Sequence, residues 1–339
     1  MTSFVDDLSN FVLSPDWGRR DLFSSSLHWT ILSNGDADFH DNVIFFGFNG
    51  NQPDPVLVVK IPRLAENGWM LKVEYDHLIE LWNCIGENAA SYVPKPYALT
   101  TIQERPILML SYVSGESLTR LSPKSFWRSR RQVLALAKEA VYSLLKLNQL
   151  TETPIEQGES KDSRFLEKAE KFKELFQVSS EEKRVLADLV ETVRIRTSSA
   201  IDKVIIQGDF WHGNMIRDKK RGSLMLVDWQ FARWSADVSM DVYFFLLAGA
   251  LSATENDEVE QRAKYAFALL KEWRKDVMSE YLAAYGVPER YVLLPQRDGM
   301  MMCCVEKAVR SALEFGYSHP DDLLWRHLFA ELMNWPNEN

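Results

Sequence analysis

Two carboxylates and one carboxamide follow two short apolar segments in the second half of the chain. Residues 204–206 lead to Asp209, and Asn214 comes five residues later. Residues 224–227 lead to Asp228. A positioned carboxylate can orient a hydroxyl group and accept its proton, and Mg²⁺ prefers a few hard oxygen ligands beside phosphate oxygens. The set therefore indicates phosphoryl transfer, and the alternative is an acidic loop whose side chains only cap turns.

The elements that precede this set are rich in β-structure. Three runs of β-branched and aromatic residues, separated by turn residues, predict an antiparallel meander over 27–32, 42–48 and 55–61. Apolar residues at helical spacing predict a helix over 69–85. A further hairpin is predicted near 95–100 and 106–113. The first third of the chain is thus expected to form a small sheet with one helix.

Helical patterns dominate after residue 114. Ser122 and Pro123 form a favourable N-cap and first-turn pair, which predicts that a long helix begins there. Further helices are predicted over 164–178, 180–200 and most of 237–339, with short strands around a turn at 203–228. We therefore predict an α+β chain in three parts: a lead-in at 1–27, a small antiparallel sheet with one helix at 28–113, and a larger, mostly α-helical part at 114–339.

Three sequence motifs around Asp209, Asp228 and Asp241 resemble those of a known superfamily. Gly208-Asp-Phe-Trp-His-Gly-Asn214, Val227-Asp-Trp-Gln230 and Asp237-Val-Ser-Met-Asp241 are similar to the aminoglycoside phosphotransferase and choline kinase-like superfamily. The sequences of these motifs are most similar to those of the ecdysteroid kinase-like branch, and fructosamine kinases are also similar. The resemblance implies a two-lobed, protein-kinase-like fold that acts on small molecules.

The same resemblance implies roles for single residues. Asp209 matches the catalytic base of the superfamily, and Asn214 and Asp228 match its metal ligands. Asp241 matches an aspartate that supports the catalytic loop. Gln207 departs from the pattern, because the superfamily commonly has His there, and we interpret it as a side chain that supports the loop. His212, inside the loop, is equally a satisfied loop histidine or a substrate contact.

Upstream residues fit the phosphate-holding part of such a fold. Lys60 ends the third strand-like run, where kinase-type folds carry a phosphate-binding lysine that pairs with a helix glutamate. Glu74 on the following helix is the best partner, and Glu80 is second. Taken alone, Lys60 is an ordinary lysine at the end of a strand. Its functional assignment depends on the downstream set.

Two further segments complete the predicted nucleotide site. Residues 107–116 resemble the hinge of the superfamily, which implies that the Ser111 carbonyl and the Val113 amide contact adenine. An edge strand followed by a turn would give the same pattern. The candidate phosphate loop begins with Ser33, Asn34 and Gly35. It has one glycine and three aspartates, whose charge beside a triphosphate is unfavourable unless they face solvent.

The composition excludes several classes of protein. With 39 basic and 48 acidic residues among 339, the net charge is -9, which disfavours a general nucleic-acid binder. The longest apolar run, 242–251, is too short to cross a bilayer, so no membrane span is expected. The three cysteines, Cys84, Cys303 and Cys304, imply no disulfide framework, and we expect a cytoplasmic protein.

These observations predict an ATP-dependent kinase that uses Mg²⁺ and phosphorylates a hydroxyl group of a small molecule, with no protein partner. A protein serine/threonine kinase is a weaker alternative, because no Ala-Pro-Glu segment and no long activation loop follow Asp228. A catalytically silent nucleotide-binding protein on the same fold is the other alternative. The identity of the acceptor depends on helices roughly within 124–200 and 250–335, where the resemblance is weakest.

Overall fold

The computed structural model of the chain describes residues 3–14, 17, 27–33, 42–122, 124–156, 163–254, 258–286, 290–315 and 320–335. The chain divides into two compact units. Unit 1 comprises Met1–Glu116 and Ile216–Ala232, and unit 2 comprises Ser117–Met215 and Arg233–Asn339. Neither unit is continuous in sequence. Asp228 therefore belongs to the same unit as the N-terminal sheet, whereas Asp209 does not.

Unit 1 is built on a five-stranded antiparallel sheet with the order β1-β2-β3-β5-β4. Its strands are β1 (Leu27–Ser33), β2 (Asn42–Asn49), β3 (Leu57–Pro62), β4 (Pro96–Ile102) and β5 (Arg105–Ser111). The predicted meander and hairpin are confirmed, because runs of β-branched and aromatic residues between turns form strands in both places. In the central strand, Lys60 pairs with Ile44 of β2 and Leu108 of β5.

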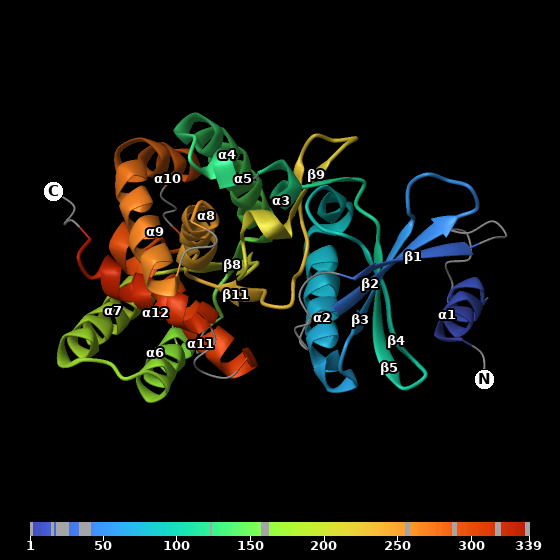
Figure 1. Cartoon of the computed structure of the whole chain (residues 1–339), viewed down its shortest axis with the longest axis horizontal. Helices are drawn as coiled ribbons and strands as arrows, with labels where there is room; N and C mark the ends of the chain where they lie inside the picture. The colour runs from blue at the N-terminus through green and yellow to red at the C-terminus, as the bar shows by residue number, and fades with distance from the viewer. Residues whose placement is uncertain are drawn as a thin grey trace. The chain divides into compact units, whose positions relative to one another are not determined.

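The two faces of the sheet are covered by different helices. Alternate side chains of β3 point to opposite faces. One set packs with α1 (Phe4–Leu13) in an apolar cluster that includes Leu57, Val59 and Ile61. Helix α2 (Gly68–Ile85) contacts β3, β4 and β5, and Figure 1 shows α1 and α2 on opposite sides of the sheet. Lys60 alternates with the apolar set and therefore emerges on the side of α2.

Helix α2 carries one charged residue on its buried face. The buried positions recur at intervals of three or four residues and are Met70, Leu71, Glu74, Leu78, Leu81 and Ile85. This spacing places them along one side of the helix, as the sequence predicted. Glu80, the second candidate partner for Lys60, is exposed. The fold thus presents Glu74, and not Glu80, to the sheet.

A small second sheet has the order β10-β9-β6. Its strands are β6 (Gly115–Ser117), β9 (Met215–Asp218) and β10 (Leu224–Leu226). The backbones approach so closely here that a Cβ atom at Gly115 would clash with the carbonyl of Arg217. The Leu226 amide also donates to the Tyr92 carbonyl at 2.7 Å. These contacts hold residues 216–226 in unit 1 although they follow most of the chain.

Unit 2 is mostly helical, which confirms the predicted α+β class. Its helices before the Asp209 loop are α3 (Leu118–Leu121), α4 (Lys124–Trp127), α5 (Arg130–Thr151), α6 (Ser163–Leu175) and α7 (Ser180–Ser198). Those after it are α8 (Ser239–Ser252), α9 (Val259–Trp273), α10 (Ser279–Tyr285), α11 (Gln296–Phe315) and α12 (Pro320–Leu332). Strand β8 (Asp202–Ile206) pairs with the short strands β7 (Thr153–Pro154) and β11 (Arg233–Ser235).

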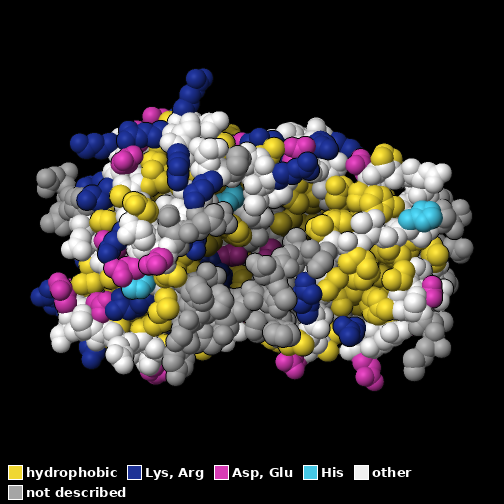
Figure 2. All heavy atoms as spheres, in the orientation of Figure 1, with side chains coloured by type: hydrophobic (Ala, Val, Ile, Leu, Met, Phe, Trp, Pro, Cys, Tyr) yellow, Lys and Arg dark blue, Asp and Glu magenta, His cyan; other side chains and the backbone are white. Residues whose placement is uncertain are grey.

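The core of unit 2 surrounds α8. Every residue from Ser239 to Leu251 is buried, so the apolar run noted in the sequence is an internal helix with no polar face. It contacts α5, α9 and α11. Among the described residues, no helix combines the length and the apolar character needed to cross a bilayer. On the face drawn in Figure 2, hydrophobic side chains gather over the sheet of unit 1, whereas acidic and basic side chains are interspersed over unit 2.

One helix boundary predicted from the sequence is wrong. The short helix α4 begins at Lys124, directly after the Ser-Pro pair, but the long helix begins only at Arg130. The Ser122 hydroxyl donates to the carbonyl of Leu118, the first residue of α3. The break allows Trp127 to be fully buried, with its ring 4.6 Å from that of His212. The Ser-Pro pair thus precedes a short helix, and the chain breaks after Trp127 before the long helix begins.

Candidate active site

In unit 1 a lysine and two carboxylates form a compact cluster. The Lys60 Nζ lies 2.7 Å from Glu74 Oε2 and 3.0 Å from Asp228 Oδ1. Glu74 is fully buried, and the Lys60 side chain is 11% exposed. The expected pair between Lys60 and Glu74 is therefore present, and Asp228, 168 residues away in sequence, joins it. The ammonium group on β3 is held by carboxylates from α2 and from the segment after β10.

Charge in this cluster is set by burial and by the pairing. Burial lowers the pKa of Lys60, but the carboxylates of Asp228 and Glu74 outweigh that effect and raise it above its ordinary value. Burial raises the pKa of Glu74, and Lys60 opposes this shift. Because an ammonium with a raised pKa stays protonated at neutral pH, Lys60 is a fixed cation, suited to contact a polyanion such as a triphosphate.

The backbone at Asp228 is unusual. Its φ is 64°, a left-handed conformation that a non-glycine residue adopts at a cost. The next residue, Trp229, is fully buried, and its amide lies 3.4 Å from Glu74 Oε1. The Trp229 carbonyl oxygen lies 3.0 Å from His77 Nδ1, which donates a hydrogen bond to it when this nitrogen is protonated. The packing of Trp229 against α2 holds the turn that aims Asp228 at Lys60.

The segment predicted to meet adenine follows β5. The Ser111 hydroxyl accepts from the Lys95 amide at 2.8 Å, and the Ser111 amide donates to the Lys95 carbonyl at 2.9 Å. Ser111 is thus fixed at the end of the sheet. Val113 is buried, and within the described part of the chain its amide donates no hydrogen bond. An amide without a protein acceptor is consistent with the predicted contact to a base.

The predicted phosphate loop lies largely outside the described residues. Ser33 is the last residue of β1. Asn34 and Gly35 lie outside the described part of the chain, as do the three aspartates Asp36, Asp38 and Asp41. The assignment of this loop to phosphate therefore stays a prediction.

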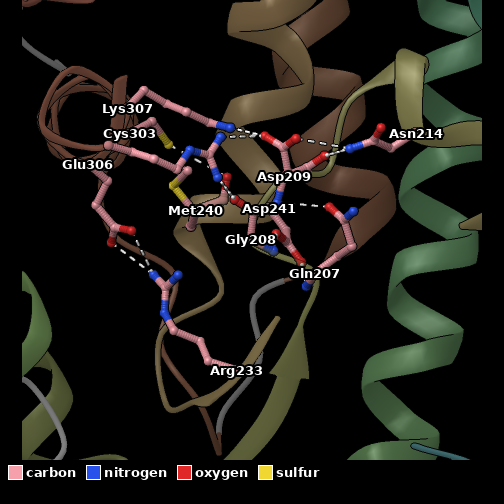
Figure 3. Close-up of polar contacts among 11 residues, drawn as sticks. Gln207, Gly208, Asp209, Asn214, Arg233, Met240, Asp241, Cys303, Glu306 and Lys307 are labelled. Carbon is pink, nitrogen blue, oxygen red and sulfur yellow. Dashed lines mark hydrogen bonds and ion pairs between the residues drawn. The ribbon is translucent and has the colours of Figure 1, made fainter. Parts of the chain in front are cut away.

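In unit 2 the buried carboxylate of Asp241 supports the loop that carries Asp209. Asp241 accepts from the Gln207 amide at 2.7 Å and from the Gly208 amide at 2.8 Å. Gly208 has a φ of 74°, which glycine adopts without strain, and this turn directs Asp209 away from β8. Figure 3 shows Asp241 beside Gly208 and Gln207. The expected supporting role of Asp241 is confirmed.

The Gln207 side chain takes part in the same support. It is buried, and its Oε1 accepts from the Asp209 amide at 2.8 Å. The interpretation of Gln207 as a loop-supporting residue is therefore confirmed. His212 is also buried, packs on Trp127, and does not line the pocket beside Asp209. Burial lowers its pKa to about 4, so the ring is neutral at physiological pH. This favours the loop histidine over the substrate contact.

Asp209 and Asn214 lie side by side at the end of the loop. The Asn214 Nδ2 donates to Asp209 Oδ2 at 2.9 Å and to the Asp209 carbonyl at 3.1 Å. With its amide nitrogen so engaged, Asn214 turns Oδ1 away from Asp209, as Figure 3 shows. Among the described residues, this oxygen accepts no hydrogen bond. The amide oxygen is therefore available to a ligand.

Two cations on α11 contact Asp209, and the sequence reasoning did not find them. Lys307 forms an ion pair with Asp209 Oδ1, and Arg310 Nη2 lies 2.6 Å from the same oxygen. The Lys307 side chain is 5% exposed and its Nζ lies 3.5 Å from the centre of the Phe244 ring. Figure 3 shows Lys307 and Asn214 on opposite sides of Asp209.

A signal for Lys307 was present in the sequence. It follows an apolar run at residues 300–305 in a helical segment, and a charged residue buried in such surroundings is expensive unless it is paired. Burial lowers the pKa of Lys307 well below its ordinary value and Arg310 acts in the same direction, while Glu314 opposes. The adjacent Asp209 carboxylate favours the ammonium form.

The residues available for Mg²⁺ have suitable chemistry. Asp228 offers a carboxylate that is 29% exposed, and Asn214 offers its amide Oδ1. Hard oxygen atoms of this kind are what Mg²⁺ prefers. Among the described residues, no group of three or more His, Cys, Asp or Glu side chains could hold a metal ion. Mg²⁺ bound partly by phosphate oxygens does not need such a group.

Comparison with known proteins places these features in a family. Residues 41–281 match the phosphotransferase enzyme family, which is most of the chain and includes every residue of both clusters except Lys307 and Arg310. No curated protein matches the sequence significantly.

Several solved structures share the fold. A thermostable variant of the aminoglycoside phosphotransferase APH(4)-Ia, solved with ADP and hygromycin B, has a TM-score of 0.57 at 12% identity and covers 98% of this chain and 100% of its own. A putative fructosamine-3-kinase from Haemophilus somnus has a TM-score of 0.52 at 15% identity, with 95% and 97% covered. A choline/ethanolamine kinase family protein from Mesorhizobium loti has a TM-score of 0.52 at 10% identity, with 98% and 96% covered.

Proposed function

The chain belongs to the phosphotransferase enzyme family, and from this premise we propose that it is an ATP-dependent kinase that transfers the γ-phosphate to a hydroxyl group of a small molecule. The observation that supports the proposal most strongly is the Lys60 cluster. A buried glutamate holds a strand lysine at 2.7 Å, and the same lysine lies 3.0 Å from Asp228. An acidic loop that only caps turns has no need of this arrangement.

Lys60 would bind the α- and β-phosphates. Its ammonium is a fixed cation, and Glu74 keeps it directed by two close oxygen contacts at 2.7 and 2.8 Å. Ser33, Asn34 and Gly35 would cover the phosphates with backbone amides. The Ser111 carbonyl and the Val113 amide would hydrogen-bond the adenine ring. Main-chain recognition of this kind makes few demands on side-chain identity.

Asp209 would orient the acceptor hydroxyl and accept its proton. A carboxylate has about four lone-pair sites. Two on Oδ1 are used by Lys307 and Arg310, and one on Oδ2 by Asn214. The remaining site on Oδ2 can accept the hydroxyl proton while the acceptor oxygen attacks the γ-phosphorus and the bond from that phosphorus to the β-γ bridging oxygen breaks, which releases ADP.

Asp228 and Asn214 would hold Mg²⁺ through one carboxylate and one amide oxygen. When bound, Mg²⁺ neutralises negative charge on the phosphate oxygens during transfer. Asp228 keeps its place through the Lys60 contact and the buried Trp229. Asn214 keeps its place through its two hydrogen bonds to Asp209. Each of the two residues is thus held in place within its own unit.

A protein kinase fits the structure less well. Only residues 229–238 separate Asp228 from α8, and they include β11, so no long loop is available there to present a protein substrate. The free thiols Cys84, Cys303 and Cys304 support action in the cytoplasm.

The assignment to the ecdysteroid kinase-like branch rests on the motif sequences alone.

The test is phosphate addition to a metabolite and antibiotic panel, measured by mass, with ATP and Mg²⁺ present. We expect at least one alcohol to gain one phosphate, and Lys60→Ala to abolish this. Lys72→Ala is the matched control, because Lys72 is an exposed lysine on α2 that pairs with Asp76 and should not affect turnover. Stabilisation by nucleotide with no acceptor phosphorylated would instead identify a silent nucleotide-binding protein.

A further inference from the structure

Unit 2 contains a pocket beside Asp209. Its volume is about 350 Å³, within the range of small-molecule sites. Its charged lining includes Asp209, Lys307 and Arg310, together with Arg262 of α9. Aromatic side chains, including Phe244 and Trp325, supply the apolar surface. All lining residues belong to unit 2, so the pocket is defined without reference to unit 1.

The pocket has a positive charge balance in an acidic protein. Lys307 and Asp209 form a pair that carries no net charge, whichever of the two holds the proton. The remaining charged side chains are Arg262, Arg310 and Glu314, and both guanidinium groups stay protonated at any physiological pH. The balance is one excess cation, although the whole chain has a net charge of -9. A ligand that completes the pocket would therefore be negative.

Hydrogen-bond donors on the pocket wall point to the same ligand chemistry. The Arg262 Nε is buried and has no partner in the described part of the chain. The Ser311 side chain is 6% exposed, and its hydroxyl likewise has no partner among those residues. Buried polar groups normally find partners, so donors left over in a pocket indicate acceptors on a ligand. A guanidinium group matches the paired oxygens of a carboxylate or phosphate.

We propose that this pocket binds the acceptor, and that the acceptor is a small alcohol that also carries an anionic group, a carboxylate or a phosphate. Arg262 and Arg310 bind the anionic group, the aromatic walls hold the carbon skeleton, and the hydroxyl meets Asp209 Oδ2. The inference rests on the proposed kinase function and adds the substrate class. A polycationic acceptor, such as an amino sugar, would bring its charges against two arginines.

Matched alcohols test the proposal. Each set shares one skeleton and hydroxyl and differs in the charged group: phenyllactate, phenyllactamide and 1-amino-3-phenylpropan-2-ol form one set, and glycerate, glycerol 3-phosphate and glycerol form another. Phosphorylation is followed by mass with ATP and Mg²⁺, and binding is followed separately by the thermal shift of the full-length protein without nucleotide. We expect the anionic members to be preferred in both assays. Comparison of glycerate with glycerol 3-phosphate distinguishes carboxylate from phosphate.

The variant Arg262→Gln tests whether the preference for anionic acceptors depends on this pocket. It should raise the KM for an anionic acceptor about 10- to 100-fold, the value of a charged hydrogen bond, with little change in the KM for ATP. Arg262→Lys should recover part of the loss. Arg130→Gln is the control, because Arg130 is an exposed arginine that pairs with Glu272 and Asp276.

The outcomes separate the two proposals. Equal use of anionic, neutral and cationic alcohols would contradict the proposed anionic acceptor but not the proposed kinase function. An unchanged KM for the anionic acceptor in Arg262→Gln would do the same. Absence of phosphorylation with anion-dependent stabilisation that Arg262→Gln removes would overturn the kinase and support the pocket. Failure of every anionic probe to bind or react would overturn the acceptor class.

Discussion

Replacement of Asp241 by Asn should change how stability depends on pH and should also slow the reaction. Burial raises the pKa of Asp241 from 3.8 to about 6, and the amides of Gln207 and Gly208 oppose this shift. Because the folded-state pKa lies above the unfolded one, the carboxyl group contributes stability below about pH 4 that is lost as the pH rises to about 6. This difference corresponds to about 3 kcal/mol, to order of magnitude.

The amide of Asp241→Asn does not titrate, so the variant should lack this pH dependence. Relative to wild type, its free energy of unfolding should improve as the pH rises from 4 through 6, by about 2 kcal/mol at pH 6 and slightly more at pH 7.5. Turnover should move in the opposite direction. Above pH 6 both carboxylate oxygens of wild-type Asp241 accept from loop amides, whereas the variant offers only one acceptor. A displaced loop misplaces Asp209, and kcat should fall about 10- to 100-fold.

Urea unfolding followed by tryptophan fluorescence at pH 4, 5, 6 and 7.5 measures the first effect, and initial rates at pH 7.5 measure the second. Asp237→Asn is the matched control. Burial also raises the pKa of Asp237 to about 6, but its side chain bonds the Ser239 amide and not the loop. Asp237→Asn should reduce the pH dependence of the free energy of unfolding and leave kcat unchanged. Stability profiles of Asp241→Asn and wild type that run parallel would refute the reasoning.

Three further substitutions test separate parts of the structure. Asp209→Asn should lower kcat about 10²- to 10⁴-fold, while ATP affinity measured by calorimetry stays within a few-fold; near wild-type turnover would reject Asp209 as the base. Asp228→Ala should lower both the rate and the Mg²⁺-dependent affinity for ATP, and loss of rate alone would contradict its role as a metal ligand. Gly249→Ala should cost about 1–3 kcal/mol in thermal unfolding, because the added methyl group would clash with the buried Trp127 ring; an unchanged Tm would show that the ring can move.

Much of unit 1 could be predicted because its signals are local. Alternating apolar residues in the third strand predicted a sheet, and helical spacing after residue 68 predicted α2. The pairing of Lys60 with Glu74 was predicted from the likeness of these elements to kinase-type folds, which carry such a lysine and glutamate. The Asp209 loop was recognisable because its residues are close in sequence. These features depend on short-range periodicity and spacing, which a single sequence displays directly.

The features that were missed depend on long-range packing. Lys307 contacts Asp209 across 98 residues of sequence, and no local pattern links a helix near the C-terminus to a loop in the middle of the chain. The start of α5 was misplaced because the chain first forms the short helix α4, which ends at the fully buried Trp127. The contact between Asp228 and Lys60 likewise needs the return of residues 216–232 to unit 1. Tertiary contacts decided each of these cases.

The discontinuity of unit 1 limits how its parts can be inherited or exchanged. A gene fragment that ends near residue 116 encodes Lys60 and Glu74 but lacks Asp228, the third member of their cluster. A crossover at that point between two related genes would therefore combine a lysine from one parent with an aspartate from the other. Unit 1 therefore cannot be transferred between proteins as one contiguous segment.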